Sequence, residues 1–173
     1  MKKIIILAIL SFISFGIEAQ QNKIQWLSFE EAIELNEKNP KPILVDIYTD
    51  WCGWCKRMDK TTYSNKVIVD YVNTHYYPVK LNGEEKEDIT FKGKTFTYKE
   101  NGRRGYHELA ASIMKGKMSY PTTIFLNEKI QLLQNVPGYV DAKKFEKIIA
   151  YFNEKHYKKT PWKEFEQNFK SAM

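Results

Sequence analysis

A short β-branched run that leads directly into a pair of cysteines constrains this chain more than any other feature. The run from Ile43 to Tyr48 (ILVDIY) is bounded by turn residues, which is typical of a buried strand in a sheet covered on both faces. The stretch from Trp51 to Lys56 (WCGWCK) follows it and opens a helical pattern. Cys52 and Cys55, the only cysteines of the sequence, would lie one helical turn apart, close enough to form a disulfide. We therefore expect a dithiol between a strand and a helix.

Helical and strand-like patterns alternate along the rest of the chain. Ser28 and Glu31 form a capping box for a helix that ends at Asn39-Pro40. Further helices are predicted from Cys52 to about Thr61, from a cap at Ser64, over 107–115, from a cap at Asp141, and from Thr160-Pro161. Strands are predicted over 76–81, 122–126 and 130–136, the last two as an antiparallel hairpin, with a smaller hairpin over 91–96 turning at Gly93. This order predicts an α/β fold with a mixed sheet flanked by helices.

Length and composition favour one globular domain. The chain has 173 residues, and its hydrophobic fraction of 43% excludes intrinsic disorder. Two cysteines are too few for a disulfide-dense scaffold. The net charge is +6, but the lysines are spread along the whole chain, which favours a solvated basic surface over a nucleic-acid site.

The N-terminal residues have the pattern of a secretory signal peptide. Lys2 and Lys3 precede an uncharged, mostly apolar run from Ile4 to Ile17, and the segment ends at Glu18-Ala19-Gln20-Gln21 with the expected cut after the small residue Ala19. The apolar run is short for a membrane-spanning helix. We expect a signal peptide over 1–19, and an exported domain over 20–173 that is not membrane-embedded after cleavage.

The two cysteines are expected to differ in reactivity. A thiol at a helix start faces unpaired N–H groups and the positive end of the helix dipole, so the pKa of Cys52 should fall below its free value of about 8.5. Cys52 should be reachable from solvent and attack, whereas Cys55, one turn further in, should be hidden and resolve. A structural zinc site would need four ligands, and none of the three histidines has a paired ligand spacing. An inert disulfide this short would stabilise the fold little, so redox catalysis without metal or cofactor is favoured.

These residues resemble the thioredoxin-like thiol–disulfide oxidoreductases, specifically the exported bacterial type. The resemblance covers about 24–153 and implies a thioredoxin-like fold. It rests on Ile43 to Asp46, Trp51 to Lys56, Val79 to Asn82, Tyr120 to Thr122, and Gly138 before the last long helix.

The resemblance also implies site roles. It makes Asp46 a buried carboxylate that helps to take the proton from Cys55, where the alternative is a polar residue at a sheet end. Lys80 would moderate that charge, with a simple solvent-reaching lysine as the alternative. Pro121 is expected to be cis, with the Tyr120 backbone offering hydrogen bonds to a substrate segment.

The same resemblance assigns a substrate surface beside the cysteines. Trp51, Gly53, Trp54, Tyr120 and Pro121 would form it, with the tryptophans and Tyr120 as an apolar rim. Core packing is the alternative for Trp51.

Two departures from thioredoxin stand out. Trp54 occupies the position where thioredoxin has proline, and this dipeptide strongly affects redox potential, so the direction of electron flow does not carry over. A segment over about 83–105 is inserted before the cis-proline strand and either selects a partner or is a surface hairpin. A helical extension is expected over about 154–173.

The leading functional prediction is a periplasmic disulfide reductase acting on exported proteins, re-reduced by a membrane thiol carrier. An oxidant or isomerase with the same site is the enzymatic alternative. A Cu(I)-binding dithiol delivery module is the alternative from another class.

Overall fold

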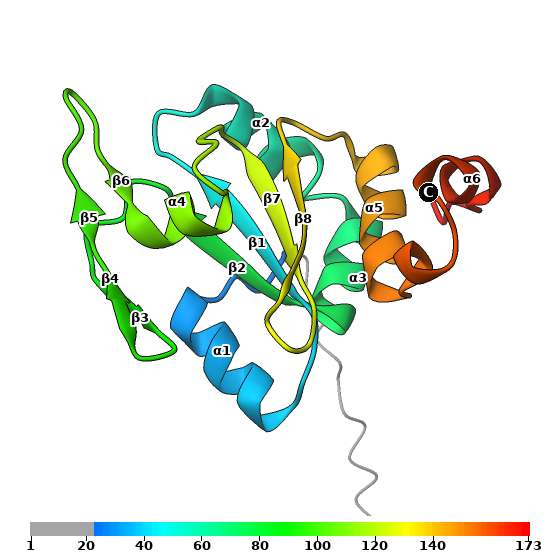
Figure 1. The fold of residues 1–173 in the computed structure, drawn as a ribbon. Coiled ribbons are helices and arrows are strands. Elements are labelled where there is room, and N and C mark those ends of the chain that lie inside the picture. The colour runs from blue at the N-terminus through cyan, green and yellow to red at the C-terminus, as the bar shows by residue number, and fades with distance from the viewer. Residues whose placement is uncertain (1–22) are drawn as a thin grey trace, which may run out of the picture.

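The computed structural model describes residues 23–173, and the signal peptide predicted over 1–19 lies outside them. Four strands form a mixed sheet in the order β2-β1-β7-β8 (Figure 1). β1 (Ile43–Tyr48) pairs parallel with β2 (Tyr77–Asn82) and antiparallel with β7 (Thr122–Leu126), which forms a hairpin with β8 (Leu132–Pro137). This confirms the predicted mixed sheet and its antiparallel hairpin.

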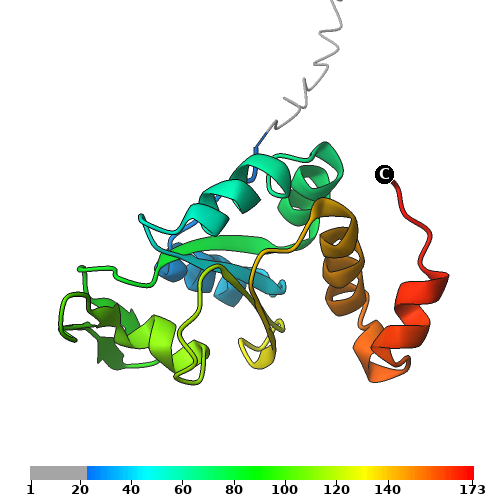
Figure 2. The same cartoon turned by 90° about the horizontal axis from the view of Figure 1, so that it is seen from above.

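Alternation along β1 divides the core between two faces of the sheet, because successive side chains of a strand point in opposite directions. Ile43, Val45 and Ile47 pack with α1 (Phe29–Lys38) and α4 (Glu108–Ile113). Leu44 packs on the other face, which is covered by three helices (Figure 2). These helices are α2 (Gly53–Thr61), α3 (Lys66–His75) and α5 (Ala142–Asn153). Asp46 shares the parity of Leu44, so its side chain is directed toward α2.

The predicted caps are mostly confirmed. Ser28 and Glu31 form the capping box of α1, and the Asp141 side chain caps α5. The Ser64 prediction is wrong: Asn65 caps α3 by accepting hydrogen bonds from the N–H groups of Val67 and Ile68. Ser64 instead donates to the carbonyl of Lys60 one turn earlier, at 2.7 Å.

The inserted segment is folded onto the core. β3 (Ile89–Phe91) and β4 (Lys94–Phe96) form the predicted hairpin, with Gly93 at its turn in the left-handed region at φ 74°. β5 (Tyr98–Lys99) pairs with β6 (Tyr106–His107). His107 therefore ends a strand and caps α4, so the predicted helix over 107–115 is shorter than expected. Ile89 and Phe96 belong to the same apolar cluster as α1 and α4.

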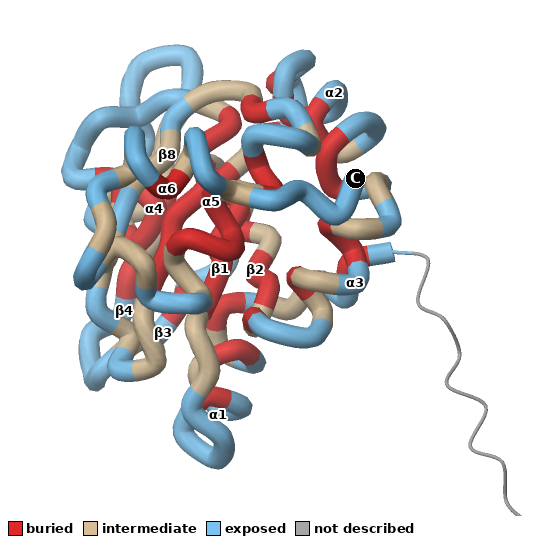
Figure 3. Tube along the Cα trace, turned by 90° about the vertical axis from the view of Figure 1, so that its right-hand side faces the viewer, coloured by how far each residue is buried: buried red, intermediate tan, exposed pale blue. Residues whose placement is uncertain are grey.

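The C-terminal extension packs beside α5. It comprises the 3-10 turn η1 (His156–Lys158) and α6 (Trp162–Asn168). Phe165 of α6 lies against Tyr151 of α5, with ring centroids 5.0 Å apart. Figure 3 shows buried chain concentrated along β1, β2 and α5, with exposed chain on the outer turns. Within residues 23–173, every helix is too short or too polar to cross a bilayer.

Candidate active site

Cys52 and Cys55 form a disulfide where β1 gives way to α2. Cys52 is the N-cap of α2, and its Sγ accepts a hydrogen bond from the Cys55 N–H at 3.1 Å. The Cys52 N–H in turn donates to the carbonyl of Thr49, which closes the turn after β1. A Cys52 thiolate at this position would keep an N–H donor and the positive end of the helix dipole.

The predicted contrast in exposure between the two cysteines is wrong for this oxidised form. Cys52 is 4% exposed and Cys55 is 2% exposed, so both are buried. The adjoining Trp51 and Gly53 are exposed and flank the Cys52 backbone. The capping position, rather than surface area, distinguishes the two sulfurs.

Asp46 lies in the middle of the sheet and is 1% exposed, which confirms its predicted burial and excludes a place at a sheet end. Its Oδ2 accepts a hydrogen bond from Lys80 Nζ at 2.6 Å, and its Oδ1 accepts one from the Tyr63 hydroxyl at 3.2 Å. Burial raises the pKa of Asp46, and the positive charge of Lys80 opposes that rise without cancelling it.

Lys80 joins two carboxylates. Besides Asp46, its Nζ contacts Asp59 Oδ1 at 2.5 Å, and its side chain is only 19% exposed, so the solvent-reaching interpretation is wrong. The ammonium also lies 4.9 Å from the Trp26 ring centroid and 5.3 Å from that of Tyr63. Burial acts to lower the pKa of Lys80, but the charge of Asp46 and the hydrogen bonds to both carboxylates raise it overall.

Asp59 and Tyr63 were not identified from the sequence. Asp59 follows Cys55 by four residues, so both side chains lie along one face of α2. That spacing was a usable signal. Tyr63 follows the end of α2, and no local pattern indicates that its hydroxyl turns back to Asp46. Burial, followed by the charge of Asp46, raises the pKa of Tyr63 well above its ordinary value, which keeps its proton available for donation.

The predicted rim residues adjoin the cysteines in sequence or contact a residue that does. Trp51 is 48% exposed and Trp54 is 55% exposed, so core packing does not explain Trp51. The Trp51 and Tyr120 rings meet edge to face with centroids 5.8 Å apart. The Tyr120-Pro121 peptide bond is cis, as predicted. Burial and then the charge of Glu84 raise the pKa of Tyr120 to about 12.

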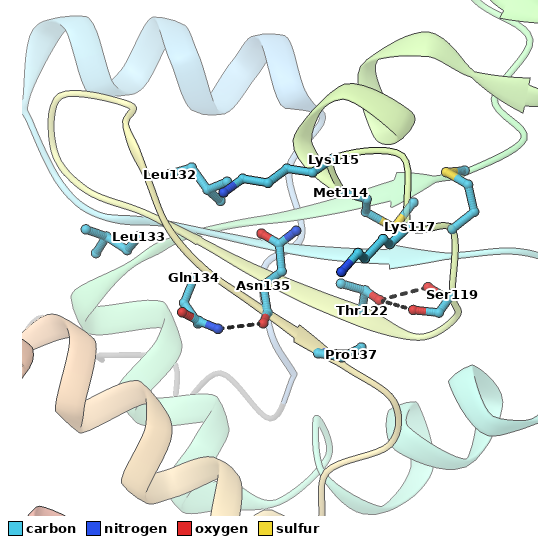
Figure 4. A pocket seen from close by; sticks show the side chains of 11 residues that line it. Met114, Lys115, Lys117, Ser119, Thr122, Leu132, Leu133, Gln134, Asn135 and Pro137 are labelled. Atoms are coloured by element: carbon cyan, nitrogen blue, oxygen red, sulfur yellow. Dashed lines mark hydrogen bonds between the residues drawn. The ribbon is translucent and has the colours of Figure 1, made fainter. Parts of the chain in front are cut away.

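Other parts of the described chain offer little for thiol or metal chemistry. Within residues 23–173, no three His, Cys, Asp or Glu side chains are grouped to hold a metal ion. The cavity in Figure 4, about 540 Å³, runs along the free edge of β8. It is lined by residues of β8, by Thr122 of β7 and by side chains of the segment between α4 and β7, and neither cysteine lines it.

Comparison with known proteins agrees with this architecture. A family model described as a thioredoxin-like domain matches residues 29–153. The thiol:disulfide interchange protein DsbD of Yersinia enterocolitica is 32% identical over 62 residues, which is 32% of this chain and 11% of that protein. Human spermatogenesis-associated protein 20 is 26% identical over 86 residues, 49% of this chain and 11% of that protein. The chain thus spans about a tenth of the length of these curated relatives.

Solved structures share the fold. A putative disulphide-isomerase from Bacteroides thetaiotaomicron is 27% identical with a TM-score of 0.54, covering 77% of this chain and 95% of that one. A thioredoxin-fold protein from Helicobacter pylori is 18% identical with a TM-score of 0.59, covering 75% of this chain and 84% of that one.

Proposed function

This chain belongs to the thioredoxin-like domain family, and from that premise we propose that it is a thiol–disulfide oxidoreductase that reduces disulfides of exported proteins. The observation that carries the proposal is the Cys52–Cys55 disulfide at the N-terminus of α2, on the sheet face that holds the buried Asp46. The disulfide is the oxidised form of the pair, and the dithiol is the form that acts on a substrate.

Two thiolate attacks complete the reduction. The Cys52 thiolate attacks one sulfur of the substrate disulfide, which breaks that bond, forms a mixed disulfide and releases the first substrate thiolate. The Cys55 thiolate then attacks Cys52 Sγ, which restores the Cys52–Cys55 disulfide and releases the second substrate thiolate. The protein loses two electrons, the substrate gains them, and both released thiolates take up protons.

Asp46 supplies the base for the second attack. Its burial raises its pKa toward the working range, so its carboxylate can accept the Cys55 proton when the mixed disulfide forms. Before the proton arrives, the Lys80 ammonium partly neutralises the negative charge of the Asp46 carboxylate. No metal or organic cofactor enters these steps.

The rim supplies the binding surface for the substrate. Trp51 and Trp54 adjoin the two cysteines, and Trp51 contacts the Tyr120 ring. An extended segment can pair with the Tyr120 backbone before the cis Pro121 as an added strand. We place the protein in the periplasm on the signal peptide expected over 1–19. A membrane thiol carrier would return its two electrons.

Trapping of the mixed disulfide tests the proposal. Cys55→Ser should accumulate covalent adducts with substrate proteins that a thiol reductant releases, and Cys52→Ser should form none. The adducts are detected on non-reducing gels and identified by mass spectrometry. Wild-type exchange rates in both variants would reject the mechanism.

The named relatives support a second direction of electron flow, because one is an interchange protein and another a putative disulphide-isomerase. Equilibration with a glutathione redox buffer separates the two. In a mildly reducing buffer, a reductase with a low redox potential has its two cysteines as the disulfide at equilibrium. A strong oxidant, whose redox potential is higher, has them as the dithiol there.

A further inference from the structure

Two tryptophan–arginine pairs lie beside the disulfide. The Arg104 guanidinium carbon is 4.0 Å from the Trp51 ring centroid. On α2, the Arg57 guanidinium carbon is 5.3 Å from the Trp54 ring and 5.4 Å from the Tyr139 ring. Trp51 and Trp54 directly precede Cys52 and Cys55, so each pair borders one of the two cysteines.

The inserted segment over 83–105 supplies the arginine of the first pair. At its start, Glu84 Oε1 accepts a hydrogen bond from Trp51 Nε1 at 3.1 Å. Gly83 lies so close to Tyr120 that a Cβ would come within 2.5 Å of the phenol ring. Near its end, Arg104 covers Trp51. Arg104 lies in the loop between β5 and β6, so this loop contacts the turn before α2.

Both guanidinium groups are available to an incoming carboxylate. Within residues 23–173, neither Arg57 nor Arg104 lies within ion-pair distance of an acidic side chain. Arginine above an aromatic ring keeps the N–H donors at its edge free, and their fork geometry fits a carboxylate. Asp50 and Glu84 are acidic groups of the same rim, but the Glu84 carboxylate binds the Trp51 indole.

On the basis of the proposed function, we propose that the preferred substrate is an extended segment whose cysteine is flanked by aspartate or glutamate. One carboxylate binds Arg104 of the inserted segment and another binds Arg57 of α2, while the apolar parts of the segment cover the tryptophans. The inserted segment is therefore the part of the rim that selects the substrate.

Two matched peptides test this inference. Each carries one cysteine in a mixed disulfide with 2-mercaptoethanol, flanked by glutamates in one peptide and by glutamines in the other. At low salt, the fully reduced protein should react with the glutamate peptide about tenfold faster than with the glutamine peptide. This is the combined effect expected of two exposed ion pairs. The ratio should fall toward one at high salt, which screens exposed charges.

Variants connect the preference to its residues. The double variant Arg57→Gln with Arg104→Gln should bring the ratio of the two rates close to one. Arg103→Gln is the matched control, because Arg103 is exposed and is not one of the arginines above a tryptophan ring, and it should keep the ratio.

Reduction of a neutral small disulfide, bis(2-hydroxyethyl) disulfide, distinguishes a failure of the substrate preference from a failure of the proposed function. If the wild-type protein reduces it but treats both peptides alike, the substrate preference is wrong and the proposed function stands. If the protein exchanges with no disulfide at all, the proposed function itself is wrong.

Discussion

The two sides of the Cys52–Cys55 disulfide differ in how their charges are held. Toward the sheet, Asp46 and Lys80 are enclosed and paired with each other, with Asp59 and Tyr63 completing the network. Toward solvent, the rim has exposed tryptophans and arginines without ion pairs in the described chain. Burial sets protonation states, whereas exposed and unsatisfied groups remain available for binding. Changes on the sheet side should therefore affect every substrate, and changes on the rim should affect the choice among substrates.

The largest expected effect is on the rate at which the mixed disulfide resolves. Asp46→Asn keeps the shape of the side chain but removes the base, so resolution by Cys55 should slow about 100-fold at neutral pH for all substrates. The lifetime of the mixed disulfide, measured by acid quench and mass spectrometry, checks this. Asp50→Asn, an exposed residue of the following turn, should have little effect. Equal slowing in both variants would contradict the specific role of the buried Asp46 carboxylate as the base.

The next largest effect is on the free energy of unfolding. Lys80→Met leaves Asp46 and Asp59 facing each other without their cation, which should cost about 2–3 kcal/mol. Lys66→Met breaks the exposed pair with Asp70 and should cost less than about 0.5 kcal/mol. Urea denaturation at neutral pH compares the free energies of unfolding of the two variants. Similar losses would contradict the difference between the enclosed charges of the sheet side and exposed surface charges.

The pH dependence of stability follows from the raised pKa of Asp46. Because the folded protein holds this proton more tightly than the unfolded chain, stability falls as pH rises from the ordinary value of 3.8 through the folded-state pKa. Asp46→Asn removes this loss, and Lys80 keeps Asp59 as its partner.

The variant should therefore be more stable than wild type at neutral pH. The difference should vanish below pH 3.8, where the carboxyl is protonated in both states. Thermal unfolding of both proteins across pH measures this difference in stability. A difference that stays constant with pH would contradict the raised pKa of Asp46.

A smaller effect is expected at Tyr63. Tyr63→Phe removes a hydrogen bond that stabilises the Asp46 carboxylate, so the pKa of Asp46 should rise further and the pH profile of resolution should move to higher pH. Tyr76→Phe is the matched control, because it removes another buried hydroxyl, bonded to the carbonyl of Ile149. Both should lose about 1 kcal/mol of stability, but Tyr76→Phe should leave the pH profile unchanged.

The smallest effect belongs to the rim. Glu84→Gln keeps an oxygen acceptor for Trp51 but removes a negative charge near Arg104, so the preference for the glutamate peptide should increase about twofold. The same pair of peptides measures it. Glu87→Gln, exposed and further along the segment, should change nothing. A decrease in the preference would contradict the proposed role of the inserted segment.

Local signals predicted those parts of the molecule that depend on neighbours in sequence. The capping box of α1 and the turn at Gly93 involve residues within one turn of each other. The cap of α3 was placed one residue early because Ser64 and Asn65 are both good caps. Their backbone positions, which no composition rule supplies, made Asn65 the acceptor.

Sequence alone determined the dithiol, its place between a buried strand and a helix, and the carboxylate of Asp46 inside that strand, because spacing and alternation are local properties of a chain. Tertiary structure decided which groups share the site. Asp59 and Tyr63 meet Asp46 through Lys80 and a returning hydroxyl, and Arg104 reaches Trp51 across the inserted segment. Such contacts join residues on different elements, so they follow from packing against the sheet, and the spacing of Asp59 from Cys55 shows only which face of α2 it shares.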